Sequence, residues 1–145
     1  MTVKVDASAT IARSPEDVFA VLTDVPHHTN WAKGPDKIRD VSENPAILGT
    51  TWTQISKLLG REVETHLKVN VYEAGRKFGF EADKPIAFQM LWQLEPSGND
   101  TTVNVTVEGM PEGLFAVATP LVRKALTDTV SSDLATLKTQ LEAKA

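Results

Sequence analysis

The side chains best suited to metal binding or acid–base chemistry are few in this sequence. Its imidazoles are His27, His28 and His66, and it contains no cysteine. Adjacent residues such as His27 and His28 do not share a helix face, and His66 falls on the polar side of an alternating segment. We therefore expect neither a metal site nor a base–nucleophile pair. The missing thiols exclude cysteine-ligated zinc or iron.

The acidic side chains do not suggest a catalytic pair either. Glu62, Glu64 and Glu108 lie in the polar phase of predicted strands, where side chains point to solvent. General acid–base catalysis needs titratable groups beside a substrate, and no two carboxylates are predicted to face one cavity. The sequence also lacks Gly-rich phosphate loops and the Gly-x-Ser-x-Gly nucleophile elbow. These patterns identify no catalytic residue and predict no cofactor.

Apolar and aromatic side chains are better placed for binding. Phe78 and Phe80 share one face of a predicted strand, and Phe88, Met90 and Trp92 share one face of the next. Flat rings and a flexible thioether suit an apolar or aromatic ligand. The same residues serve equally well as ordinary core, so both interpretations stay open at this point.

The roles of two further tryptophans are also open. Trp31 either covers one end of a pocket or anchors a short helix. The strand around Trp52 has no clearly apolar face, because both of its alternating sets of residues are mixed. If the set with Trp52 points inward, Gln54 and Ser56 become polar groups that orient a ligand carbonyl or hydroxyl.

The chain has the composition of one globular domain, which we place over residues 1–145. Hydrophobic residues make up 41% and charged residues 23% of its 145 residues, enough for one core. Its net charge is -4 and its Lys and Arg residues are scattered singly, which disfavours nucleic-acid binding. Residues 1–10 do not resemble a signal peptide, and the longest apolar stretch, 113–122, is too short to span a membrane. We expect a cytoplasmic protein.

Hydrophobic periodicity predicts the elements that position these side chains. Residues 3–11 alternate as a half-buried strand, and Ser14 followed by Pro15 predicts a helix start. Pro26 is expected to open a second short helix that carries Trp31. Short turns then join six strand-like segments, which favours an antiparallel meander. These segments are 37–42, 50–59, 62–72, 76–82, 86–95 and 101–109.

An apolar sheet face and an apolar helix stripe are predicted to pack together. The sheet face includes Val63, Thr65, Leu67, Val69, Val71, Val103, Val105 and Val107. From Glu112 onward a helical period takes over, with the stripe Phe115, Val122, Leu126, Val130, Leu134, Leu137 and Leu141. Pro120 either kinks this helix, which we favour, or starts a new helix capped by Thr119.

Five short segments carry a family resemblance that covers essentially the whole chain. They are 11–19 (IARSPEDVF), 23–24 with Trp31, 48–52 (LGTTW), 100–103 (DTTV) and 133–138 (DLATLK). In this order and spacing the chain resembles the START-like, or helix-grip, fold of Bet v 1 allergens. Within that SRPBCC superfamily it is similar to the polyketide cyclase/dehydrase-like group. The resemblance implies an α+β domain: a curved antiparallel sheet of about seven strands wraps a long C-terminal helix, with two short helices after the first strand.

The resemblance also implies a pocket between sheet and helix for a lipid, polyketide or aromatic metabolite. A strongly curved sheet around one helix leaves volume that side chains often fail to fill, which favours a cavity over a solid core. The residues predicted to line it are Trp31, Trp52, Leu67, Val69, Phe78, Phe80, Phe88, Met90, Trp92, Val105, Phe115, Val122 and Leu126.

Three functions fit this pattern. The leading interpretation is a binding or carrier protein for a hydrophobic small molecule, because no catalytic motif of the family can be matched to this sequence. One alternative is a cyclase or dehydratase that holds a reactive chain folded for ring closure, which requires a polar side chain in the pocket. Another is a protein-interaction module such as a toxin–antitoxin component, which a filled interior would favour. The sequence fits both a monomer and a homodimer.

Overall fold

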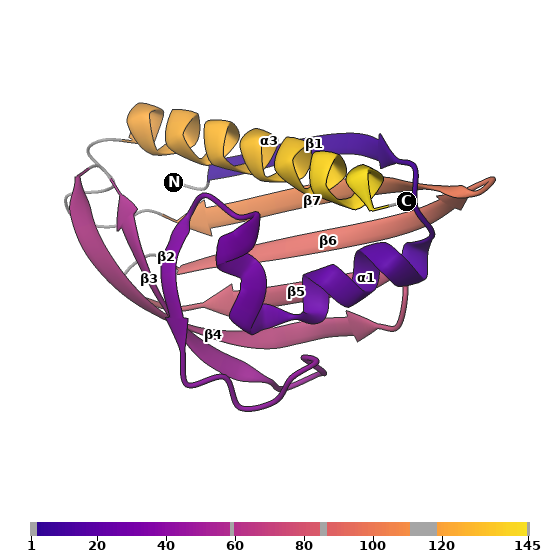
Figure 1. Ribbon diagram of the computed structural model, residues 1–145. Helices are drawn as coiled ribbons and strands as arrows, with labels where there is room; N and C mark the ends of the chain where they lie inside the picture. Colours follow the sequence, from indigo (N-terminus) through magenta and orange to yellow (C-terminus); the bar gives the residue numbers. More distant parts are fainter. Residues whose placement is uncertain (1–2, 59, 85–86, 111–118, 145) are drawn as a thin grey trace.

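Figure 1 shows a computed structural model of the protein, which describes residues 3–58, 60–84, 87–110 and 119–144. Seven antiparallel strands form one sheet in the order β1-β7-β6-β5-β4-β3-β2. The elements are β1 (Val3–Ile11), α1 (Pro15–Thr23), η1 (Val25–Asn30), β2 (Pro35–Arg39), β3 (Thr51–Leu58), β4 (Arg61–Glu73), β5 (Lys77–Ala82), β6 (Ala87–Ser97), β7 (Asp100–Met110) and α3 (Thr119–Ala143).

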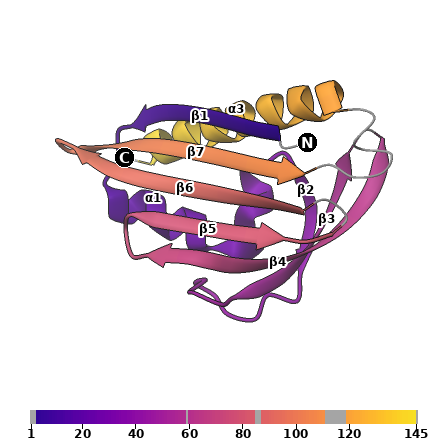
Figure 2. The same ribbon diagram turned by 180° about the vertical axis from the view of Figure 1, so that it is seen from behind.

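The described helices cover one face of the curved sheet. In Figure 1, α3 runs along β1 and β7, while α1 and the 3-10 helix η1 lie in front of the neighbouring strands. Figure 2, seen from behind, shows the opposite face of the sheet uncovered by helices. The predicted architecture is confirmed: a curved antiparallel sheet, two short helices after the first strand and a long C-terminal helix.

Local sequence explains where the first helix begins and what it buries. The Ser14 side chain accepts a hydrogen bond from the backbone N–H of Asp17 at 3.2 Å, and Pro15 takes the first helical position. This is the predicted cap, and it satisfies one N–H that the first turn leaves free. Val18, Phe19 and Leu22 then point into the core.

The strands follow the predicted segments, with the largest difference at β2. This strand ends at Arg39, where the pairing with β3 stops, and not at residue 42. Asp40 has a φ of 56°, in the left-handed region, so the extended conformation cannot continue through it. The prediction missed this end because nothing in the local hydrophobic pattern marks a change of backbone conformation.

One predicted inward residue, Val71, is on the other face of the sheet. The register of β4 against β5 shifts between Val69 and Val71, so that Val71 pairs with Gly79 and Tyr72 pairs with Phe78. The extra residue of this bulge reverses the side-chain alternation beyond it. Tyr72 consequently turns inward and its ring meets Phe19 edge-on, with 5.6 Å between the ring centroids. The prediction for Val71 was wrong because alternation alone cannot reveal a bulge.

The long C-terminal helix is confirmed over Thr119–Ala143. Val130, Leu134, Leu137 and Leu141 of its apolar stripe are buried. The predicted start at Glu112, the position of Phe115 and the kink expected at Pro120 all depend on residues 111–118, which lie outside the described residues. No helix in the described part of the chain is both long and apolar enough to cross a membrane.

Candidate functional site

A cavity of about 250 Å³ lies between the sheet and the first half of α3. Side chains from β1, β3, β4, β5, β6 and β7 form its sheet side, and residues 122–133 of α3 form its helix side. The end of α1, η1 and the loop after η1 close it laterally. The cavity therefore occupies one end of the space that the curved sheet encloses.

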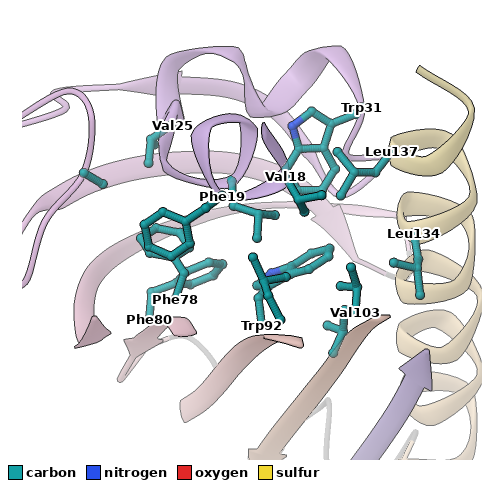
Figure 3. Close-up of a cluster of buried hydrophobic side chains, with 14 of the residues drawn as sticks. Val18, Phe19, Val25, Trp31, Phe78, Phe80, Trp92, Val103, Leu134 and Leu137 are labelled. Atoms are coloured by element: carbon teal, nitrogen blue, oxygen red, sulfur yellow. The ribbon is translucent and has the colours of Figure 1, made fainter. Parts of the chain in front are cut away.

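Aromatic side chains form much of its inner wall. Phe78 and Phe80 from β5 and Trp92 from β6 point into the interior, as Figure 3 shows. Trp31, which follows η1, meets Trp92 edge-on at 5.5 Å between ring centroids. Edge-to-face pairs stabilise the arrangement beyond simple burial, and this wall offers flat apolar surfaces to a bound group.

The structure brings most of the predicted ligand-binding residues to this cavity. Those that line it are Trp31, Phe78, Phe80, Phe88, Met90, Trp92, Val122 and Leu126. Trp31 lies at the C-terminal end of η1 and also borders the cavity.

Four predicted residues lie in the core instead: Trp52, Leu67, Val69 and Val105. Trp52 packs behind the aromatic wall of the cavity, with 5.2 Å between the ring centroids of Trp52 and Phe80. Alternation identifies every residue on the inner face of a strand, but the cavity borders only one end of the sheet. Phe115 lies outside the described residues.

The open question about β3 is settled by this geometry. Trp52 is buried, and Gln54 and Ser56 of the same alternating set line the cavity. Thr65 of β4 pairs with Gln54 across the strands and lines it too. Within the described part of the chain, none of these three polar side chains has a hydrogen-bond partner. They therefore offer donors and acceptors to a bound molecule.

His28 contributes a neutral imidazole to the cavity wall. It is buried, and its Nε2 lies 2.6 Å from the backbone carbonyl oxygen of Leu22. Burial lowers the pKa of His28 to about 4, so the ring is uncharged at neutral pH. Because the carbonyl can only accept, Nε2 carries the proton and donates it, which leaves Nδ1 as an acceptor.

Asp133 of α3 is the buried acid of the cavity, and the sequence analysis did not single it out. Its Oδ1 accepts a hydrogen bond from the backbone N–H of Lys33 at 2.6 Å. Burial raises the pKa of the Asp133 carboxyl to about 6, against the opposing effect of that hydrogen bond. A signal was present: Asp133 lies three residues after Val130 and four before Leu137, within the apolar stripe of the helix.

His66 and the outward acids lie on the solvent side, as predicted. His66 and Glu64 are exposed on the convex side of β4, and His27 is exposed beside Asp24, with 2.8 Å between Nδ1 and Oδ2. The described residues contain no cluster of three His, Asp or Glu side chains that could hold a metal ion. The chemistry available in the cavity is thus that of one carboxyl, one neutral imidazole, the ammonium of the exposed Lys57 and a few uncharged polar groups.

This fold and cavity define the helix-grip class of the START and Bet v 1 proteins. The chain belongs to the family described as polyketide cyclase / dehydrase and lipid transport, whose model matches residues 2–142. No curated protein matches the chain.

Solved structures share the fold at low sequence identity. The Zhui aromatase/cyclase from a Streptomyces species superimposes with a TM-score of 0.83 at 14% identity, over 99% of this chain and 96% of that one. The TTHA0849 protein from Thermus thermophilus gives 0.81 at 19% identity, over 98% of this chain and 99% of that one. A START superfamily protein from Mycobacterium smegmatis gives 0.79 at 13% identity, over 99% of both chains. At such identities the likeness shows the fold alone.

Proposed function

We propose that the protein binds a hydrophobic small molecule in the cavity between the sheet and α3. The observation that supports this most directly is the cavity itself, which is lined by Trp31, Phe78 and Trp92 and lies beside the packed core. Ligand pockets combine a mostly apolar lining with a few polar groups, and here Gln54 and Ser56 supply such groups. The family description, which includes lipid transport, is consistent with a carrier role.

The size of the cavity limits what fits. Its volume of about 250 Å³ lies near the lower end of ligand pockets, which span roughly 300–1,000 Å³. A molecule with one or two fused rings or a short acyl chain is the expected occupant. Shape and the polar groups on β3 and β4 then provide specificity.

The test is to fill the cavity and measure binding. Ala125 lines it, whereas Ala135 lies on the exposed side of the same helix. We expect naphthylmethanol to quench tryptophan fluorescence saturably in the natural protein and in Ala135→Phe, because Trp31 and Trp92 border the cavity. Ala125→Phe should lose this binding. Equal binding by both variants would refute the proposed location.

A search for the natural ligand uses the freshly purified protein. Native mass spectrometry followed by organic extraction should detect a stoichiometric extra mass of lipid or aromatic size. The same extra mass on Ala125→Phe would place the molecule outside the cavity and contradict the proposal.

A second candidate function, ring closure or dehydration of a polyketide-like chain, is favoured by Asp133. A cavity carboxyl whose pKa is raised to about 6 can give or take a proton near neutral pH. The measurement is the rate of aromatic product formation from a linear poly-β-ketone thioester. Acceleration that disappears in Asp133→Asn would support an enzyme; no acceleration by the natural protein would reject it.

The protein-interaction alternative receives less support. A filled interior would have favoured it, whereas the described residues line a cavity. In the apolar stretch 114–122, Leu121 is 59% exposed and Val122 is buried against the cavity. Residues 114–118 of that stretch lie outside the described residues.

A further inference from the structure

Asp133 is a buried acid with no cation in contact. The residue is 4% exposed and lines the cavity. Its one hydrogen bond in the described structure comes from the backbone N–H of Lys33 to Oδ1, so Oδ2 accepts none. None of the ion pairs among the described residues, which include every Lys and Arg of the chain, involves Asp133.

The charged and titratable groups around Asp133 do not replace such a cation. Lys33 is exposed, and its charge lowers the pKa of Asp133 less than burial raises it. His28 lies on the neighbouring wall but is neutral at pH 7 and directs its proton to Leu22. Lys57, on β3, is exposed. An ionised Asp133 therefore carries a negative charge that the cavity lining does not neutralise.

The remaining groups on this side of the cavity add no side-chain cation. His28 leaves Nδ1 as an acceptor, and the Thr129 hydroxyl of α3 can donate or accept a hydrogen bond. The rings of Trp31 and Trp92 also border the cavity, and the buried Nε1–H of Trp31 has no partner among the described residues. Among the described residues, this wall therefore contains uncharged donors and acceptors beside the Asp133 carboxyl but no cation to pair with it.

We propose that the ligand is a hydrophobic amine whose ammonium group donates a hydrogen bond to Oδ2 of Asp133, while its apolar body lies against Phe78, Phe88 and Met90. This inference rests on the proposed function, because it assigns a ligand class to the same cavity. The polar groups of β3 and β4 lie on another wall and can bind a hydroxyl or carbonyl at the far end of the molecule.

Burial makes the amine the favoured partner over an alcohol or an acid. Folding has already removed most of the water around the Asp133 carboxyl, which is 4% exposed, so the ammonium loses more hydration than the carboxyl when the pair forms. A hydrogen bond between charged groups is stronger than one between neutral groups, which favours the amine over the matching alcohol. A carboxylate ligand would place two negative charges close together in a desolvated site, so fatty acids and other anions are disfavoured.

The experiment compares three probes that share one ring system: naphthylmethylamine, naphthylmethanol and naphthoate. Affinities are measured by calorimetry at about pH 8, where Asp133 is ionised and the amine is still mostly protonated. We expect the amine to bind about 10- to 100-fold more tightly than the alcohol. Naphthoate should bind more weakly than either.

Two variants of α3 separate the carboxyl from the general charge of the helix. Asp133→Asn keeps the size and the acceptor for the Lys33 N–H but removes the charge, so the preference for amine over alcohol should collapse to about twofold or less. Asp128→Asn removes an exposed acid of the same helix, and its preference should match that of the natural protein. Circular dichroism confirms that both variants are folded.

The outcomes distinguish failure of the amine proposal from failure of the proposed binding function. If the alcohol binds but the amine has no advantage, or if naphthoate binds best, the amine proposal fails and the proposed function stands. If none of the three probes binds the natural protein, both fail. An amine advantage that survives in Asp133→Asn would also overturn the assignment of Asp133.

Discussion

The two halves of the interior are built from the same strands and the same helix, yet one is filled and the other is hollow. In the filled half, Leu137 and Leu141 of α3 pack with Ile11, Leu94 and Val103 from the sheet in one core cluster. In the hollow half, residues 122–133 of α3 face the sheet across the cavity.

Helix α1 contributes to the filled half. It packs on β5, β6 and β7, and its Val18 and Phe19 belong to the core cluster that also contains Leu137 and Leu141. Figure 3 shows these side chains on the same side as Leu134 and Leu137. No described element inserts comparable side chains beneath the first half of α3. The apolar stripe of α3 therefore belongs to the core where α1 side chains join the same cluster. It borders a cavity where no described element does so.

The largest difference in stability between the two halves is expected from truncating one leucine in each half of α3. Leu137 is fully buried, so Leu137→Ala should lower the free energy of unfolding by about 2–5 kcal/mol. Leu126 already borders open volume, so Leu126→Ala should cost less than about 1.5 kcal/mol. Urea denaturation measures both. Equal losses would mean that the two halves are packed alike.

Enlarging a side chain by one methylene group tests the same contrast in the opposite direction. We expect smaller changes in stability than from the leucine truncations. Val103→Leu must find room in the filled half and should lower stability by about 1–3 kcal/mol. Val122→Leu extends into the cavity and should change stability by less than about 0.5 kcal/mol. Helix and strand propensities contribute only a few tenths of a kcal/mol to this difference. A large loss in Val122→Leu would show that the cavity cannot accept even a methylene.

The smallest effect concerns the pH dependence of stability. The pKa of Asp133 is raised to about 6 in the folded protein from an ordinary value of 3.8. The folded state thus holds this proton more tightly, and the resulting stability is present below about pH 4 and is lost as pH rises through 6. Asp133→Asn does not titrate. The free energy of unfolding of Asp133→Asn, relative to that of the natural protein, should therefore increase by on the order of 1 kcal/mol between pH 4.5 and pH 8.

His28 also titrates, so the natural protein and Asp133→Asn must be compared at each pH. Its pKa is lowered to about 4, so its contribution is complete above about pH 6.5 and is lost as pH falls through 4. This trend opposes that of Asp133 in the natural protein but is common to the variant, so the difference between the two curves isolates Asp133. Parallel curves in urea denaturation would show that Asp133 is not buried as described.

Much of the fold was predictable because strand alternation and helical periodicity are local. The inward phase of Phe78, Phe80 and Trp92 follows from alternation alone, and Ser14 marks the first helix. The bulge that turns Tyr72 inward is not visible in the hydrophobic pattern, because it depends on the pairing of two strands. For the same reason the phase of the strand with Gln54 stayed open until its neighbours were known.

The candidate site was predictable only in part, because the extent of a cavity depends on what lies opposite each residue. Val105 and Val107 share one face of β7, yet only Val107 borders the cavity. Asp133 was overlooked because acids on helices are mostly solvated, although its place in the apolar stripe indicated otherwise.

Methyl NMR with added naphthylmethanol tests the contrast between the halves most directly. We expect shifted resonances for the methyl groups of Met90, Val122 and Leu126, which border the cavity, and nearly unchanged ones for Val103 and Leu141, which lie in the filled half. Shifts centred on the filled half, or on the exposed Leu48 and Leu121, would contradict the claim that the hollow half is the binding site.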